Sequence, residues 1–114
     1  MAKLQKMGAN EALNVDVSPV WDSQTAVTTS NTDTSRITID KNKNHKIAVT
    51  ATNPIIVSFS TSASYTVDAT NDLLLYGAQT HYLNVPDLGD PNDSVYFCFR
   101  RNGSTNSTVT SVLM

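Results

Sequence analysis

Hydrophobic and polar residues alternate with a period of two along most of this chain. The alternation begins at residues 13–18, "LNVDVS", and returns in "RITID", "HKIAVTA", "IIVSFS", "SYTVDA", "SVYFCF" and "STVTSVL". In each run one face of a strand is apolar and the other is polar, which is typical of a half-buried strand. A further run, "DLLLYGAQTHYLNV", predicts two short strands on either side of Gly77.

Turn residues separate these runs at short spacing, and no window of helical length keeps a helical period. We therefore expect an all-β fold: a single antiparallel β-sandwich or barrel, either jelly-roll or Ig-like, with an extended N-terminal arm. The arm covers residues 1–12 and the β-sandwich domain covers residues 13–114. Residues 22–35 are rich in hydroxyls and predict an edge strand followed by a loop.

The alternation also predicts which side chains are buried. We expect one residue in two to face the core within each run: Ile37, Ile39, Ile47, Val49, Ala51, Ile55, Val57, Phe59, Tyr65, Val67, Ala69, Val95, Phe97 and Phe99.

The stretch "FRRNGSTNST" predicts a hairpin, because Asn-Gly between two alternating runs is a strong hairpin signal. A two-residue turn and a three-residue loop would give different registers. We prefer the three-residue loop, which places Val95 opposite Val109 and Gly103 in the left-handed conformation. Arg100 and Arg101 are then expected to face solvent.

Composition narrows the function classes. The chain has 114 residues, of which 39% are hydrophobic and 16% are charged, and Ser and Thr make up about a quarter. The net charge of −2 argues against nucleic acid or an acidic membrane as partner. The single cysteine cannot form an internal disulfide. The N-terminal residues lack the apolar segment of a signal peptide.

No catalytic constellation is visible, so we expect a protein that is not an enzyme and that has no cofactor and no metal. Cys98 lies on the face opposite Phe97 and has no evident base. His45 and His81 lack a third zinc ligand. Whether Asp87, Asp90 and Asp93 in "PDLGDPNDS" bind calcium stays open, because their spacing differs from that of the EF-hand loop. The N-x-[ST] triplets follow from a composition rich in these residues: Asn92, Asn102 and Asn106.

Two stretches, "VTATNPIIVSFSTSASYTVDATNDLLLYGAQTHYLNVP" and "VYFCFRRNGSTNSTVTSVLM", resemble small all-β virion proteins of tailed bacteriophages of the head decoration or cement type. The resemblance covers about the last two thirds of the chain. It implies a structural virion protein that stabilises the head by binding between capsomers. The implied partners are the major capsid protein and further copies of the chain in a symmetric oligomer, without nucleic acid or membrane. The implied location is the virion, assembled in the host cytoplasm.

For such a protein we expect contacts to other subunits from the arm, the edge segment and the last turn: Leu4, Met7, Leu13, Trp21, Val27, Arg100 and Arg101. The alternative is a tail or fibre module that binds a receptor or carbohydrate. It predicts a concave cluster of exposed aromatic residues drawn from Trp21, Tyr76, Tyr82 and Tyr96. Four points stay open: whether the protein lies on the head or the tail, which capsid protein it binds, the stoichiometry of that binding, and the order of the strands.

Overall fold

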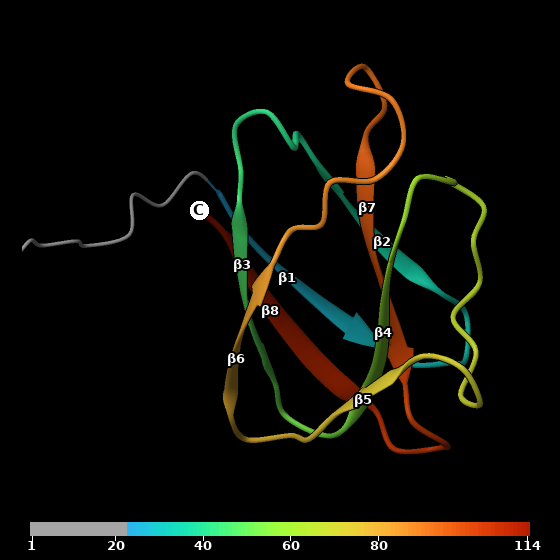
Figure 1. Ribbon diagram of the computed structural model, residues 1–114. Helices are drawn as coiled ribbons and strands as arrows, with labels where there is room; N and C mark the ends of the chain where they lie inside the picture. The colour runs from blue at the N-terminus through green and yellow to red at the C-terminus, as the bar shows by residue number, and fades with distance from the viewer. Residues whose placement is uncertain (1–22) are drawn as a thin grey trace, which may run out of the picture.

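The computed structural model describes residues 23–114, and this part of the chain is built from eight strands without a helix (Figure 1). The strands are β1 (Ser23–Thr29), β2 (Ser35–Ile39), β3 (Lys46–Ala51), β4 (Ile55–Ser60), β5 (Leu73–Leu75), β6 (Thr80–Asn84), β7 (Val95–Arg101) and β8 (Ser107–Leu113). The prediction of an all-β fold is confirmed. The edge strand and loop expected from residues 22–35 are also confirmed for the residues described, because β1 lies at a sheet edge and a loop follows it.

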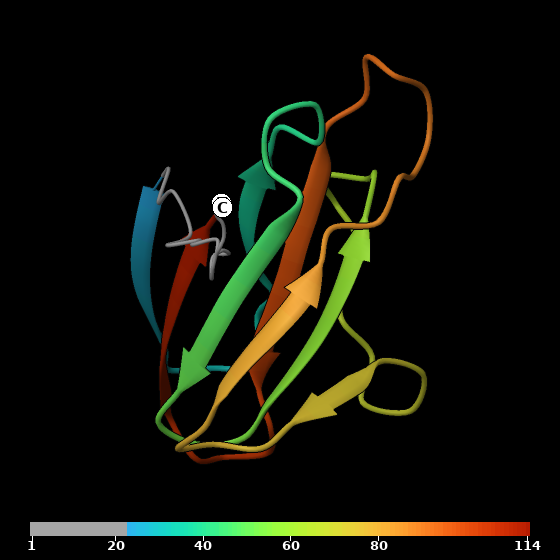
Figure 2. The same cartoon turned by 60° about the vertical axis from the view of Figure 1, so that its left-hand side comes forward.

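The strands form two four-stranded antiparallel sheets, in the orders β1-β8-β3-β6 and β2-β7-β4-β5 (Figure 2). The pairing is nested: β1 pairs with β8, β2 with β7, β3 with β6 and β4 with β5. Only the connection between β4 and β5 stays within one sheet, and each other connection crosses to the opposite sheet. The chain is therefore a long antiparallel ribbon coiled around one core.

The core lies between the two sheets and is made by the alternating apolar positions. Ile47, Val49 and Ala51 of β3 are buried in the same core as Val95, Phe97 and Phe99 of β7, and the burial of all six was predicted by the alternation. The ring of Phe97 lies 5.4 Å from that of Phe59 and 5.5 Å from that of Phe99, measured between centroids. At these distances aromatic rings stabilise one another in addition to the apolar area that they bury.

The predicted hairpin between β7 and β8 is wrong, because the two strands belong to different sheets. Val95 pairs with Ile39 of β2, whereas Val109 pairs with Val27 of β1 and Ala51 of β3. The connection after β7 carries the chain across the sandwich instead. The left-handed conformation expected of Gly103 is confirmed, with a φ of 69°.

The strand predicted for "SYTVDA" is also wrong, because residues 61–72 contain turns and no strand. The Asp68 carboxylate accepts a hydrogen bond from the Thr70 N–H at 2.8 Å, and the Asp68 carbonyl accepts one from the Asp72 N–H at 2.9 Å. Short polar side chains that bond the nearby backbone in this way favour turns over strands. The segment lies on the outer side of the sheet β2-β7-β4-β5, where Val67 packs against Ile56 and Cys98.

Candidate interaction surface

The two outer faces of the sandwich differ, because one of them is covered by the chain itself. Segment 61–72 is tied over the sheet β2-β7-β4-β5 by two arginines. The Arg36 guanidinium donates to the carbonyl of Tyr65, and Arg100 Nε donates to the carbonyl of Val67 at 3.3 Å. The Val67 N–H in turn donates to Thr34 Oγ1 at 3.0 Å. Segment 61–72 therefore forms a third layer over part of this face, where Ile56 and Cys98 are buried.

The opposite face, the outer side of the sheet β1-β8-β3-β6, carries no such layer among residues 23–114; we call it the open face. The register places its side chains in cross-strand rows: Thr28 and Thr108; Ala26, Thr110, Thr50 and Thr80; Gln24, Val112, Ala48 and Tyr82; and Lys46 and Asn84. Most of these side chains are small and uncharged.

Hydroxyls on the open face bond to one another across strands. Oγ1 of Thr28 lies 3.1 Å from Oγ1 of Thr108, and Oγ1 of Thr50 lies 2.9 Å from that of Thr80. A hydroxyl has one donor and two acceptor positions, so each of these groups keeps capacity for an external partner. The face can therefore bond to polar groups of a partner without leaving its own hydroxyls unpaired.

A shallow hollow of about 180 Å³ lies in this face. Its lining is made of small polar and apolar side chains beside one aromatic residue: Ala48, Thr50, Thr80, Tyr82, Thr110, Val112 and Met114. The Tyr82 side chain stands out from the sheet and is 69% exposed. The lysine on this face, Lys46, donates to Asn84 Oδ1 at 3.0 Å, and it marks the end of the face next to the C-terminus.

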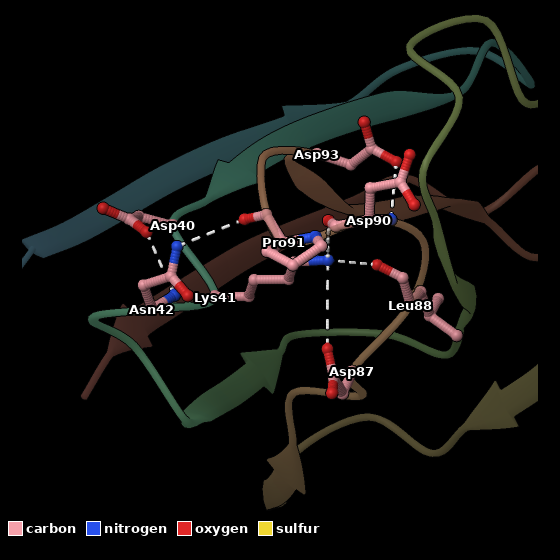
Figure 3. A network of polar contacts seen from close by, with 8 residues as sticks. All are labelled: Asp40, Lys41, Asn42, Asp87, Leu88, Asp90, Pro91 and Asp93. Atoms are coloured by element: carbon pink, nitrogen blue, oxygen red, sulfur yellow. Dashed lines mark hydrogen bonds and ion pairs between the residues drawn. The ribbon is translucent and has the colours of Figure 1, made fainter.

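The acidic loop between β6 and β7 is held by an internal ammonium group (Figure 3). The Lys41 side chain is only 5% exposed, and its Nζ donates to the carbonyl oxygens of Leu88 and, at 2.5 Å, Asp90. The carboxylate of Asp87 lies 3.9 Å from the same Nζ. Lys41 thus supplies a positive charge at the centre of the loop that the sequence suggested for calcium.

The three aspartates of this loop do not converge on one point. Asp87 faces Lys41, whereas Asp93 Oδ2 accepts a hydrogen bond from the Asp90 N–H at 2.9 Å. Throughout residues 23–114, no group of three or more His, Cys, Asp or Glu side chains is placed to hold a metal ion.

Cys98 is fully buried beneath segment 61–72, on the face opposite Phe97 and Phe99 as predicted. Burial raises the pKa of its thiol. A buried thiol that stays protonated is a poor nucleophile. His81 Nε2 lies 3.0 Å from the Tyr76 carbonyl oxygen, which is hydrogen-bonding distance. The His81 side chain of β6 therefore contacts the connection between β5 and β6.

The predicted contact residues fall into two groups. Leu4, Met7, Leu13 and Trp21, together with the arm at residues 1–12, lie outside the described residues. Val27 lies next to the central residue of β1 and is half-buried, with its side chain packed against the core.

Arg100 and Arg101 were expected to face solvent, but both are half-buried. Arg100 points away from the core between the sheets, yet it binds the carbonyl of Val67 in the covering segment. Arg101 belongs to β7 rather than to a turn, and its Nη1 donates to Asn106 Oδ1 at 2.5 Å. Both guanidinium groups therefore hold loops of their own chain.

The open face was not predicted from the sequence. Alternation marked Thr50, Thr108 and Thr110 as polar positions, but every half-buried strand has such positions. Nothing in the alternation indicates which sheet is covered by segment 61–72 and which one stays open.

Comparison of the chain with protein-family models, with curated proteins and with solved structures gave no match. Residues 23–114 contain no helix that is long and apolar enough to cross a membrane. This part of the chain thus presents a sheet face that is rich in hydroxyls and carries few charges, with a hollow beside the exposed Tyr82.

Proposed function

We propose that this protein is a structural virion protein that decorates or cements the head of a tailed phage by binding between capsomers. The observation that carries the proposal is the contrast between a sheet partly covered by segment 61–72 and an open face of mostly small, uncharged side chains. A face with few charges can pack against another protein surface without leaving charges buried and unpaired.

The nested strand order supports the same proposal at the level of the fold. Two four-stranded sheets in the orders β1-β8-β3-β6 and β2-β7-β4-β5 correspond to an eight-stranded jelly roll. Viral capsid proteins and lectins are frequent users of this architecture. Because fold alone does not determine function, the argument depends on the open face and on the sequence resemblance together.

The mechanism would be purely associative. A protein that binds only the assembled shell stabilises that shell by linkage, in proportion to the logarithm of its free concentration over its Kd. No bond is made or broken, and the residues that act are those that contact the capsid. We propose that residues 1–12 and the open face provide these contacts.

The test is cosedimentation of the purified protein with phage heads that lack it. We expect the full chain to sediment with the heads and to raise the temperature at which they disrupt. We expect Thr110→Lys, which places a charge at the centre of the open face, to abolish both effects while the protein stays folded. Thr66→Lys is the matched control, since Thr66 is an exposed threonine in the covering segment. Unchanged sedimentation of the Thr110→Lys variant would contradict the proposal.

A second candidate function is carbohydrate binding by a tail or fibre module, favoured by the exposed Tyr82 ring beside the hollow. Sugars stack on aromatic rings and bond to hydroxyls, and both are present there. Of the aromatic residues expected to line such a site, Tyr76 is exposed as well, whereas Tyr96 is half-buried under segment 61–72. Binding to a glycan array that is lost in Tyr82→Ala, without affinity for heads, would favour this function.

A further inference from the structure

The edge strand β1 has the features of a strand that pairs with another chain. Edge strands expose a row of unpaired backbone N–H and C=O groups, and proteins usually protect them by charges, prolines, bulges or short length. β1 is seven residues long, "SQTAVTT", and contains no charge, proline or glycine. It pairs with β8 along its whole length without a bulge. Among the described strands nothing pairs with its other edge (Figure 2).

The three other sheet edges in residues 23–114 lack this combination of features. β5 is only three residues long, and β2 carries Arg36 at its second position. β6 has five residues and includes His81, and a proline follows shortly after its end. β1 is therefore the longest edge and the most weakly protected one.

We propose that β1 pairs edge to edge with β1 of a second copy, antiparallel and across a two-fold axis at Ala26. In this register Ala26 faces its own copy, Gln24 faces Thr28 of the second copy, and Thr25 faces Val27. Each residue keeps its side of the sheet, because a two-fold axis at a residue pairs even positions with even ones and odd positions with odd ones, which preserves the alternation. The β1-β8-β3-β6 sheets of the two copies then form one continuous eight-stranded sheet.

The absence of charge matters most for pairing of identical strands. In a two-fold contact the same surface meets itself, so that a charged residue near the axis would lie close to its own copy. Directly opposed like charges destabilise a strand pair. β1 brings only hydroxyl, amide and small apolar groups to the axis, and the half-exposed Val27 would gain a neighbour on its open side.

The area of the open face argues for the same partner. Four strands at about 4.8 Å spacing and about six residues at 3.4 Å make a face of about 400 Å². Two copies joined at β1 present one continuous face of about twice this area. This argument rests on the proposed function, for which a larger face gives a more extensive contact with the shell. The self-association itself is independent of what binds that face, so it can be tested without a capsid.

The first test is sedimentation velocity of the full chain over a range of concentrations. We expect a dimer that dissociates on dilution, and we expect Ala26→Lys to be a monomer at every concentration. Thr80→Lys is the matched control, because Thr80 is an exposed residue of the same row on the opposite edge strand β6. Thermal unfolding should show that both variants are folded. A wild-type chain that is monomeric at all concentrations would overturn the proposal. Loss of the dimer in Thr80→Lys but not in Ala26→Lys would overturn it in favour of β6.

The second test fixes the register by crosslinking. Under mild oxidation we expect Ala26→Cys to give a disulfide-linked dimer, and we expect Thr80→Cys to stay unlinked. A mixture of Gln24→Cys and Thr28→Cys chains should give the mixed dimer. The natural Cys98 is fully buried and does not compete. Linkage of Thr80→Cys as fast as Ala26→Cys would contradict the proposed axis.

Discussion

Gly77 provides the sharpest test of how the crossing loops at one end of the sandwich are packed. A Cβ atom at position 77 would lie 2.7 Å from the Cα and 2.8 Å from the carbonyl carbon of Asn53. Both are backbone atoms of the connection between β3 and β4, which is itself held by hydrogen bonds between Asn53 and Ser107 at 2.8 and 3.1 Å. The clash in Gly77→Ala cannot be relieved by a side-chain rotation, so the backbone must move.

Overpacking of this kind costs about 1–3 kcal/mol, and the rigid neighbour places Gly77→Ala at about 2 kcal/mol. For a domain near 100 residues this lowers Tm by about 8–16 °C. The assay is thermal and urea unfolding followed by circular dichroism. Gly103→Ala is the control, because Gly103 has a φ of +69° but nothing within 4 Å of a Cβ, so only backbone strain of about 1 kcal/mol is expected. A smaller loss in Gly77→Ala than in Gly103→Ala would refute the reasoning.

Three further predictions concern single interactions. Ala78 has a φ of +59°, so Ala78→Gly should raise the free energy of unfolding by about 0.5–1 kcal/mol, and a lower Tm would contradict the strain. Lys41→Met should lower it by about 1–3 kcal/mol in urea unfolding, since the carbonyls of Leu88 and Asp90 lose a charged donor, whereas the exposed Lys46→Met should change it little. The Thr70 N–H and the Asn71 amide, both bonded to the Asp68 carboxylate, hold the Asp68 pKa below its usual range. The ionised Asp68 carboxylate therefore contributes to the free energy of unfolding at neutral pH, and this contribution is lost as pH falls below about 4. The difference in free energy of unfolding between wild type and Asp68→Asn should shrink in that pH range. A difference independent of pH would exclude this carboxylate as the cause.

The alternation of apolar and polar residues was sufficient to predict most of the strands and the core. Val95, Phe97 and Phe99 are buried as expected, and the two short strands around Gly77 are present. The period of two records only which face of a strand is buried. It does not record which strand lies alongside, so the pairing of β7 with β2 and β4 instead of β8 could not be read from it.

The candidate surface depended on features that have no local signal. Tyr65 and Val67 alternate like strand residues, but the hydrogen bonds of Asp68 and Asp72 fold their segment into turns. Arg36 and Arg100 hold this segment from strands that are distant in sequence. Segment 61–72 covers one sheet and leaves the other open among residues 23–114, and this difference is set by tertiary contacts.

The nested pairing has a consequence for how the chain folds. Each pair, from β4 with β5 outward to β1 with β8, closes a longer loop than the one inside it, and Thr29 and Ser107 in the outermost pair lie 78 positions apart. Loop closure costs entropy before distant contacts repay it, so folding should begin at the inner pair and proceed outward on a timescale of milliseconds to seconds. β1 is then the last strand to join the sheet. Until β1 pairs, one edge of β8 is unpaired. At high protein concentration, β1 of a neighbouring chain can pair with that edge instead. Refolding at dilute protein concentration should therefore favour the correct monomer fold, and crowded refolding should favour chains that have exchanged β1.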